Sequence, residues 1–455
     1  MKKEKTNDMS RREFLQRLGI GAGSAVAMMA FEPFGALART MENDGLLNDV
    51  DNRMTYRTQN GSEEQISLLG FGMMRLPDDQ EKVNQMVDYA IAHGVNYFDT
   101  APMYMGGKSE VLTGNALSRY PREKYHVATK MSNQNRRLWS FDDSKRMYEQ
   151  SFERLKVDYI DYYLLHSIGG GMESLEGRFL NNGILDFLLK EREAGRIKHL
   201  GFSYHGDVRD FDWLLDRQEE YHWDFVQIQM NFLDWRHASL RGGRRTDADA
   251  EYLYDKCEKT GVQCVIMEPL RGGAFGRMAQ ELTDQLKAVR PDDSTARWAF
   301  RWVGSYPNIL TTLSGMNRMD HLEENIKTFS PLEACTEAEN KLLAKIADEM
   351  SGFPTIPCTT CEYCMPCPYG VDIPGNFAYY NEAVNNHILP LPDKTAADFV
   401  ARKQAFTDGF KKALPDQEKW AYQCQDCEVC LSKCPQQIRI PNQMARIVET
   451  LRGPR

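Results

Sequence analysis

Between residues 70 and 330, short apolar runs typical of β-strands alternate with longer helical patterns, and this alternation limits the possible folds more than any other feature. A strand can pair with a parallel neighbour only after a crossover, so alternation predicts parallel β/α units and argues against a β-sandwich. Residues 54–69, around Asn60-Gly61, predict a hairpin before the first of these units. The expected helices cover residues 80–93, 108–117, 143–155 and 180–194.

Ionisable side chains stand where successive strands end. The first run leads into Asp99 and then, after Pro102, which cannot continue a ladder, into Tyr104. The next run ends in Lys130 and the following one in His166. Because the carboxyl ends of parallel barrel strands meet at one face, we expect these side chains to lie together. An ammonium beside a phenol favours the phenolate, a carboxylate holds the ammonium, and an imidazole can orient a substrate oxygen.

These four residues resemble the catalytic tetrad of the aldo-keto reductases, and the resemblance covers roughly residues 53–330. It implies an α/β fold, an eight-stranded (β/α)8 TIM barrel, that binds a nicotinamide cofactor and interconverts carbonyls and alcohols. It also implies that Tyr104 is the general acid/base, that Asp99 holds Lys130 beside it, and that His166 orients the substrate. Further segments agree in order with the family: 195–203, 227–231, 267–270 and 314–325.

The resemblance also implies contacts to the nicotinamide amide, its ring surroundings and the adenine. The implied positions are Ser203, Gln227, Leu270, Gly315 and Asn325. Two departures from the family pattern leave the choice between NAD and NADP open. Tyr204 stands where many members carry Asn, and Gly315 and His321 stand where NADP-preferring members often carry Lys and Arg. A 2′-phosphate is bound best by cationic donors, and Arg318 is the nearest candidate.

Eight of the eleven cysteines lie near the carboxyl end in two runs, each followed by Pro. The second run has the C-x2-C-x2-C-x3-C-P spacing of a bacterial ferredoxin, in which three thiolates hold one [4Fe-4S] cluster and the fourth holds the other. The first run has two residues, not three, before its last cysteine, so the position of that cysteine is the less regular one. The runs are Cys358, Cys361, Cys364 and Cys367, and Cys424, Cys427, Cys430 and Cys434.

The ferredoxin crossover predicts two [4Fe-4S] clusters, one held by Cys358, Cys361, Cys364 and Cys434 and the other by Cys424, Cys427, Cys430 and Cys367. Helical patterns at 377–386 and 396–414 make residues 336–455 similar to helical ferredoxin-type domains. Zinc ribbons and disulfides are the alternatives. Zinc sites usually show two separated C-x2-C pairs, and a disulfide framework does not need four cysteines in ten residues.

The first 38 residues resemble a twin-arginine export signal. Arg11-Arg12 precede Phe14, an apolar stretch covers 18–30, and Ala36-Leu37-Ala38 offers a cleavage site. The apolar stretch is short for a bilayer span, so we expect no stable membrane span in the mature chain. We expect transport by the twin-arginine machinery to the periplasm or the outer face of the cytoplasmic membrane. Residues 39–52 would be a linker and 53–335 the barrel.

Acidic residues outnumber basic ones by 65 to 56, which gives a net charge of −9 and argues against a general nucleic-acid surface. The leading hypothesis is an exported oxidoreductase for a small carbonyl or alcohol, whose clusters exchange electrons with an external redox partner. One alternative is an electron-transfer protein whose barrel is a docking scaffold without turnover. Another is that the clusters only stabilise the C-terminal domain.

Overall fold

The computed structural model describes residues 54–238, 248–390 and 396–452, so the expected export signal and linker lie outside the described residues. The chain begins there with the predicted hairpin, in which β1 (Tyr56–Thr58) pairs antiparallel with β2 (Gln65–Ser67). Ile66 of β2 is buried in one cluster with Tyr97, Tyr162 and Phe225 from inside the barrel. The hairpin therefore closes one end of the barrel with an apolar side chain.

Eight parallel strands close into a barrel in the order β10-β3-β4-β5-β6-β7-β8-β9. Nearly all of their residues are buried, as expected for a parallel sheet that is covered by helices on its outer face. The predicted barrel is confirmed. The strands are β3 (Leu69–Gly72), β4 (Tyr97–Asp99), β5 (His126–Met131), β6 (Ile160–Ile168), β7 (Ile197–Tyr204), β8 (Phe225–Gln229), β9 (Gln263–Met267) and β10 (Ile309–Ser314).

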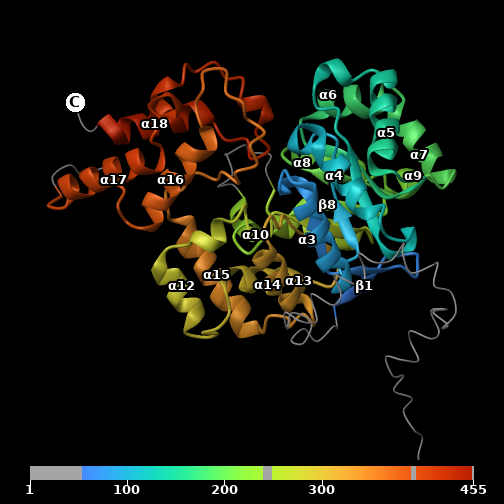
Figure 1. Cartoon of the computed structure of the whole chain (residues 1–455), viewed down its shortest axis with the longest axis horizontal. Coiled ribbons are helices and arrows are strands. Elements are labelled where there is room, and N and C mark those ends of the chain that lie inside the picture. The colour runs from blue at the N-terminus through green and yellow to red at the C-terminus, as the bar shows by residue number, and fades with distance from the viewer. Residues whose placement is uncertain (1–53, 239–247, 391–395, 453–455) are drawn as a thin grey trace, which may run out of the picture. The chain divides into compact units, whose positions relative to one another are not determined.

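Helices surround the strands, and local capping explains where several begin (Figure 1). The Asp79 and Ser140 side chains accept backbone N–H groups at the starts of α3 and α5. The longer barrel helices are α3 (Gln80–Ala92), α4 (Lys108–Leu117), α5 (Phe141–Leu155), α7 (Ile184–Glu193), α8 (Val208–Leu215), α11 (Ala250–Lys259), α12 (Gln280–Lys287), α13 (Thr295–Gly304) and α14 (Met319–Phe329). Short helical turns are α6 (Met172–Leu175), α9 (Gln218–Tyr221) and α10 (Asp234–His237).

The segment that follows the barrel is helical, as predicted. Its helices are α15 (Glu337–Ser351), α16 (Ile373–Asn385), α17 (Phe399–Ala413) and α18 (Ile440–Arg452). Phe377, Phe406, Phe410 and Ile447 form a core of their own, against which most of the cysteines pack. In the part of the chain that the structure describes, no helix is long and apolar enough to cross a bilayer.

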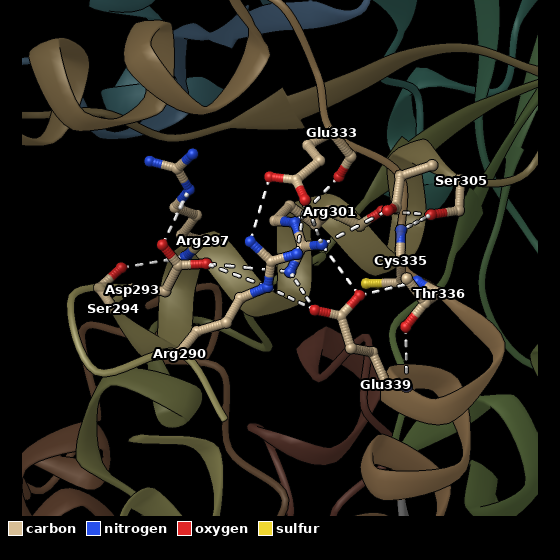
Figure 2. A network of polar contacts seen from close by, with 11 residues as sticks. Arg290, Asp293, Ser294, Arg297, Arg301, Ser305, Glu333, Cys335, Thr336 and Glu339 are labelled. Carbon is tan, nitrogen blue, oxygen red and sulfur yellow. Dashed lines mark hydrogen bonds and ion pairs between the residues drawn. The ribbon is translucent and has the colours of Figure 1, made fainter. Parts of the chain in front are cut away.

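A buried network of charges joins α15 to the barrel helix α13 (Figure 2). The Arg301 guanidinium is fully buried and donates to both Glu339 carboxylate oxygens, at 3.2 and 3.0 Å. Glu339 also forms a capping box with Thr336 at the start of α15. The helix that leads from the barrel to the cysteine runs is thus attached at its first turn by charge-assisted hydrogen bonds.

Candidate active site

The structure brings the four predicted residues together at the carboxyl ends of neighbouring strands. Asp99 ends β4, Lys130 lies near the end of β5, His166 lies near the end of β6, and Tyr104 begins the 3-10 turn η3 (Tyr104–Gly107). Lys130 Nζ is 5.0 Å from the Tyr104 ring centroid, and the Tyr104 and His166 rings meet edge to face at 5.8 Å. All four side chains are buried.

Lys130 is held by oxygen atoms from β4 and the loop after it. Its Nζ donates to Asp99 Oδ1 at 2.5 Å and to the carbonyl of Thr100 at 2.8 Å. Burial lowers the pKa of Lys130, while the Asp99 carboxylate opposes that change. Burial likewise raises the pKa of Asp99, and Lys130 and Gln227 oppose it. The pair therefore compensates two charges that would be costly to bury singly.

The electrostatics of Tyr104 differ from the sequence expectation. The neighbouring ammonium was expected to favour the phenolate, but burial raises the pKa of Tyr104 well above its ordinary value. Tyr363, Asp99 and Glu268 act in the same direction, because a second hydroxyl and two carboxylates disfavour another negative charge. Tyr104 therefore stays protonated at neutral pH and can donate a proton.

His166 is neutral and is oriented by residues that sequence reasoning missed. Its Nδ1 hydrogen-bonds the Ser132 hydroxyl at 2.7 Å, and burial together with Lys130 and Arg178 lowers its pKa well below the ordinary value. Arg178 is buried and donates to the carbonyls of His166 and Ser167. Ser132 follows Lys130 by two positions, which is the one signal that could have placed it at the same strand end.

The residues expected to contact a nicotinamide lie at the same end of the barrel. Gln227 Nε2 donates to Asp99 Oδ2 at 3.1 Å, and Ser203 Oγ accepts the backbone N–H of Ser167 at 2.8 Å. Asn325 is buried and donates to Ser314 Oγ at 2.9 Å. Buried amide and hydroxyl groups beside the tetrad fit the carboxamide end of such a cofactor.

The outer part of the expected nucleotide site is more exposed. Leu270 is partly buried in the loop after β9, and Gly315 is exposed after β10. The Arg318 guanidinium donates to both Asp320 oxygens, at 2.9 and 2.8 Å. Arg318 is thus paired with a carboxylate, and the choice between NAD and NADP stays open.

Residues of the C-terminal segment reach the same end of the barrel, which the sequence did not indicate. Tyr363 of the first cysteine run acts electrostatically on Tyr104. The Thr359 carbonyl accepts Arg75 Nη2 at 2.7 Å, and the Thr359 backbone packs closely against Gly272.

Two further contacts lie after β7 and β8. Gln436 and Gln229 exchange amide hydrogen bonds at 3.1 and 3.5 Å, and Gln437 packs closely against Gly206. With the contacts of Thr359, they reach the loops after β3 and β9 as well. The cysteine-rich segment therefore covers part of the catalytic face.

The cysteines fall into the two sets that the crossover predicts. Cys434 interacts electrostatically with Cys358, Cys361 and Cys364. Cys430 interacts in the same way with Cys424, Cys427 and Cys367. The irregular spacing before Cys367 thus does not remove it from the second set. Among the described residues, no group of His, Cys, Asp and Glu is arranged to hold a single metal ion.

The second set surrounds a hollow of about 370 Å³ with apolar walls. All four of its cysteines line the hollow, together with Val371, Ile373, Ile440 and Met444. Several sulfur atoms around one apolar space, at the surface of a small helical core, suit a multi-iron cluster.

The backbone around the second cysteine has the same conformation in both cysteine runs. Thr360 and Glu362 flank Cys361, and Asp426 and Glu428 flank Cys427; all four flanking residues have positive φ values, from 51° to 63°. Non-glycine residues rarely adopt this conformation, and it turns successive N–H groups toward one point. The Thr360 N–H accordingly points to Cys358 Sγ at 3.4 Å. The donor set fits a cluster of inorganic and cysteine sulfur.

A parallel β/α barrel with this tetrad, joined to two sets of four cysteines, defines a class of iron–sulfur oxidoreductase. Comparison with known proteins agrees. Residues 68–347 match the aldo/keto reductase family, and residues 357–439 match the 4Fe-4S dicluster domain. The chain belongs to the aldo/keto reductase family and is an oxidoreductase with a C-terminal 4Fe-4S dicluster domain.

Individual relatives align with the barrel part of the chain. The uncharacterized oxidoreductase YqkF of Bacillus subtilis is 26% identical over 64% of this chain and 95% of its own length. L-galactose dehydrogenase of Arabidopsis thaliana is 26% identical over 59% of this chain and 86% of its own length.

Solved structures agree on the fold. Aldo-keto reductase AKR11C1 from Bacillus halodurans, in its holo form, is 23% identical and superposes with a TM-score of 0.52 over 64% of this chain and 96% of its own. An aldo-keto reductase from Klebsiella pneumoniae in complex with NADPH is 21% identical, with a TM-score of 0.50 over 65% and 96%.

Proposed function

We propose that this chain is an exported iron–sulfur aldo-keto reductase that interconverts a small carbonyl compound and its alcohol. Tyr104 is the general acid/base in this proposal, and two [4Fe-4S] clusters exchange electrons with an external redox partner. The observation that carries the proposal is the position of Tyr104, which lies beside Lys130 and His166 at the end of the barrel that the cysteine-rich segment contacts.

Each side chain of the tetrad has its own role in the proposed reaction. In the reducing direction, Tyr104 donates the proton of its hydroxyl to the substrate oxygen, and Lys130, held by Asp99, stabilises the phenolate that remains. His166 is neutral and bonded at Nδ1 to Ser132, so its Nε2 is available to orient the same oxygen. The buried site excludes water, which strengthens each of these interactions.

A nicotinamide cofactor and iron–sulfur clusters would complete the proposed reaction. Ser203, Gln227, Leu270, Gly315 and Asn325 would hold a nicotinamide cofactor, which supplies or accepts the hydride. The eight cysteines would hold the clusters, which supply or accept single electrons. The presence of a bound nucleotide in the Klebsiella pneumoniae relative and the dicluster match support this assignment.

The proposal of export rests on the N-terminal sequence alone, which resembles a twin-arginine signal. The twin-arginine route is associated with prefolded, cofactor-bearing cargo, which suits a chain whose clusters are loaded before transport. A fusion of residues 1–38 to a reporter protein tests this part. We expect export of the reporter, and export that persists after Arg11 and Arg12 are both replaced by Lys would contradict the proposed route.

The decisive test of the chemistry is Tyr104→Phe in anaerobically purified holoprotein. We expect turnover of carbonyl substrates to fall by roughly 10²–10⁴-fold, because a positioned acid is lost. The cluster spectra of the variant, recorded before and after dithionite, should match those of the wild type, since Tyr104 is not a cluster ligand. Turnover or substrate-dependent cluster reduction that survives the substitution would favour the docking scaffold over the enzyme.

A further inference from the structure

A glutamine of the cysteine-rich segment lies in the mouth of the barrel. Gln436 is two positions after Cys434 and exchanges amide hydrogen bonds with Gln229 at 3.1 and 3.5 Å. Gln229 ends β8, where it alternates with Phe225 and Gln227, whose side chains lie inside the barrel. Gln229 and Gln436 are 1% and 2% exposed. A residue beside a predicted cluster ligand therefore completes the lining of the barrel mouth.

Gln229 also bonds Asp234, which is the centre of a buried polar network. Gln229 Nε2 donates to Asp234 Oδ2 at 2.6 Å, and Asn231 Nδ2 donates to the same oxygen at 2.7 Å. Arg271 Nε lies 3.8 Å from Asp234 Oδ1. Asn231 Nδ2 also donates to the Glu268 carbonyl at 3.1 Å. The network therefore joins the amide pair to two residues of the β9 loop, the name used here for residues 268–272.

The β9 loop needs such support, because its backbone conformation is unusual. Glu268 and Arg271 have φ values of 57° and 49°, a conformation that non-glycine residues rarely adopt. Residues of this kind persist only where their surroundings hold them in place. Leu270, an expected cofactor contact, lies between the two. The network thus fixes a loop on which nucleotide binding is expected to depend.

A second residue beside a cysteine contacts the same loop. Thr359 follows Cys358, and a Cβ atom at Gly272 would lie 2.2 Å from the Thr359 carbonyl oxygen. That carbonyl also accepts Arg75 Nη2 at 2.7 Å. A Cβ atom at Gly315, another expected cofactor contact, would lie 3.7 Å from Arg75 Cδ. Both parts of the chain that supply the first cysteine set therefore reach the expected nucleotide site. This set consists of Cys358, Cys361, Cys364 and Cys434.

The other cysteine set shows that the buried glutamine is not a requirement of the cysteine motif. Pro435 and Gln436 follow Cys434 as Pro368 and Tyr369 follow Cys367, so Tyr369 stands at the position equivalent to Gln436. Tyr369 is 48% exposed. The burial of Gln436 is thus explained by its contact with the barrel.

We propose that the first cysteine set, through Gln436 and Thr359, holds the β9 loop in its nucleotide-binding conformation, so that nucleotide affinity depends on a cluster bound at that set. This inference rests on the proposed function, in which the barrel binds a nicotinamide cofactor. Gln436 is a positioning residue, because it acts through Gln229 and Asp234. Coupling between two binding sites is reciprocal, so a nucleotide in the barrel also acts on the cluster.

The test is Gln436→Leu in the full-length, cluster-loaded protein, with Gln425→Leu as the matched control. Gln425 is also a glutamine beside a predicted ligand, but it is exposed and lies next to Cys424 of the second set. Anaerobic calorimetry gives the dissociation constants for NADPH and for NADH. We expect Gln436→Leu to weaken binding about 10-fold, because Gln229 loses a buried partner, and Gln425→Leu to leave binding unchanged.

A variant on the barrel side separates this role from a folding defect of the cysteine-rich segment. Gln229→Leu removes the same amide pair without altering a residue beside a cysteine, and we expect it to weaken nucleotide binding at least as much. The combined variant should bind no more weakly than Gln229→Leu alone, since both changes act on one contact. Losses that add fully would show that Gln436 does not act through Gln229.

The reciprocal effect gives a spectroscopic readout. EPR spectra of the dithionite-reduced clusters are recorded with and without saturating NADPH or NADH. We expect the nucleotide to change a cluster signal in wild type and in Gln425→Leu, and to leave the signals of Gln436→Leu unchanged. A wild-type spectrum that does not respond to bound nucleotide would overturn the coupling.

The inference and the proposed function fail in different ways. If neither NADPH nor NADH binds to the wild-type protein, the proposed function is wrong and the inference is wrong with it. If either nucleotide binds wild type and Gln436→Leu with equal affinity, only the role of Gln436 and the first cysteine set is wrong.

Discussion

At the scale of single residues, His199 on β7 shows how acid and base groups support the barrel away from the tetrad. Its Nε2 is 2.8 Å from Glu64 Oε2 and its Nδ1 is 3.7 Å from Asp224 Oδ1. Burial lowers the pKa of His199, but the nearby Asp224 carboxylate and the hydrogen bond and charge of Glu64 outweigh it and raise the pKa to about 9. The imidazolium is therefore the stable form in the folded protein at neutral pH.

The first prediction is a loss of stability in mild alkali that depends on His199. Because the folded pKa is raised, the charged histidine contributes its stabilisation fully below an ordinary pKa of about 6.5, and this is lost as pH rises toward 9. We expect that contribution to be about 2–3 kcal/mol of unfolding free energy. Denaturant unfolding of wild type and His199→Gln at pH 6 and pH 9 measures it, and an equal gap between the two proteins at both pH values would contradict it.

The second prediction concerns Lys130. Replacing it with Met leaves the Asp99 carboxylate buried without its cation, so we expect a loss of about 3–5 kcal/mol in unfolding free energy as well as a loss of turnover. Lys130→Met with Asp99→Asn should recover much of the stability but none of the turnover. Chemical unfolding and steady-state kinetics on the single and double variants measure the two effects separately.

At the scale of elements, the Glu339 carboxylate is central to the attachment of α15 to the barrel. Burial raises the pKa of Glu339, yet hydrogen bonds from Arg301, the Thr336 N–H and Arg290 outweigh burial and lower the pKa to about 2. This stabilisation is present above an ordinary pKa of about 4.3 and is lost as pH falls toward 2. The network in Figure 2 therefore supports attachment of α15 at neutral pH and weakens in acid.

The third prediction follows from this network. Glu339→Gln removes the carboxylate that hydrogen-bonds the buried Arg301 guanidinium and leaves only Asp293 and Glu333, at 3.8 and 3.7 Å, so we expect a loss of up to about 3–5 kcal/mol in unfolding free energy at pH 7. The matched control is Glu337→Gln, which lies two positions earlier and pairs only on the surface with Lys341. Its effect should stay below about 1 kcal/mol. Equal stability of the two variants would show that the network does not hold α15.

The fourth prediction concerns the loop after β9. Gly272 and Gly273 have φ values of 65° and 83°, but only at Gly272 would a Cβ atom meet Thr359. Alanine at either position strains the backbone by about 1–3 kcal/mol, whereas only Gly272→Ala should displace the first cysteine run. Hydrogen–deuterium exchange of residues 357–363 in both variants distinguishes strain from displacement. Similar exchange in the two would mean that Thr359 does not rely on this contact.

Individual elements show what the sequence could and could not predict. The helix at 108–117 and the strand at 225–229 lie where their patterns placed them, because apolar spacing and turn residues are local signals. The helix expected at 180–194 begins at Ile184, since residues 176–180 instead form a π-helical turn. The contact of Thr359 with Arg75 and Gly272 could not be predicted, because it joins residues far apart in the sequence and leaves no local pattern.

At the scale of the whole molecule, the cysteine-rich segment contacts the ends of four barrel strands, β3, β7, β8 and β9, so its state and that of the active site are linked. The fifth prediction is that removing iron changes barrel chemistry. We expect chelation to unfold the segments around the cysteines and to lower turnover, while the far-ultraviolet signal of the barrel persists. Turnover that is unchanged after complete iron loss would show that the clusters only stabilise their own domain.

The exchange of Cys367 and Cys434 between the two sets also constrains the order of events during synthesis. The first set has three of its cysteines by residue 364 and is completed only by Cys434. The second set begins at Cys367 and is completed only by Cys424, Cys427 and Cys430. Neither set of four can close while the ribosome is still short of its last cysteines. In the proposed function, iron would therefore be loaded only after Cys430 and Cys434 have been made, which suits the proposed export of a folded protein.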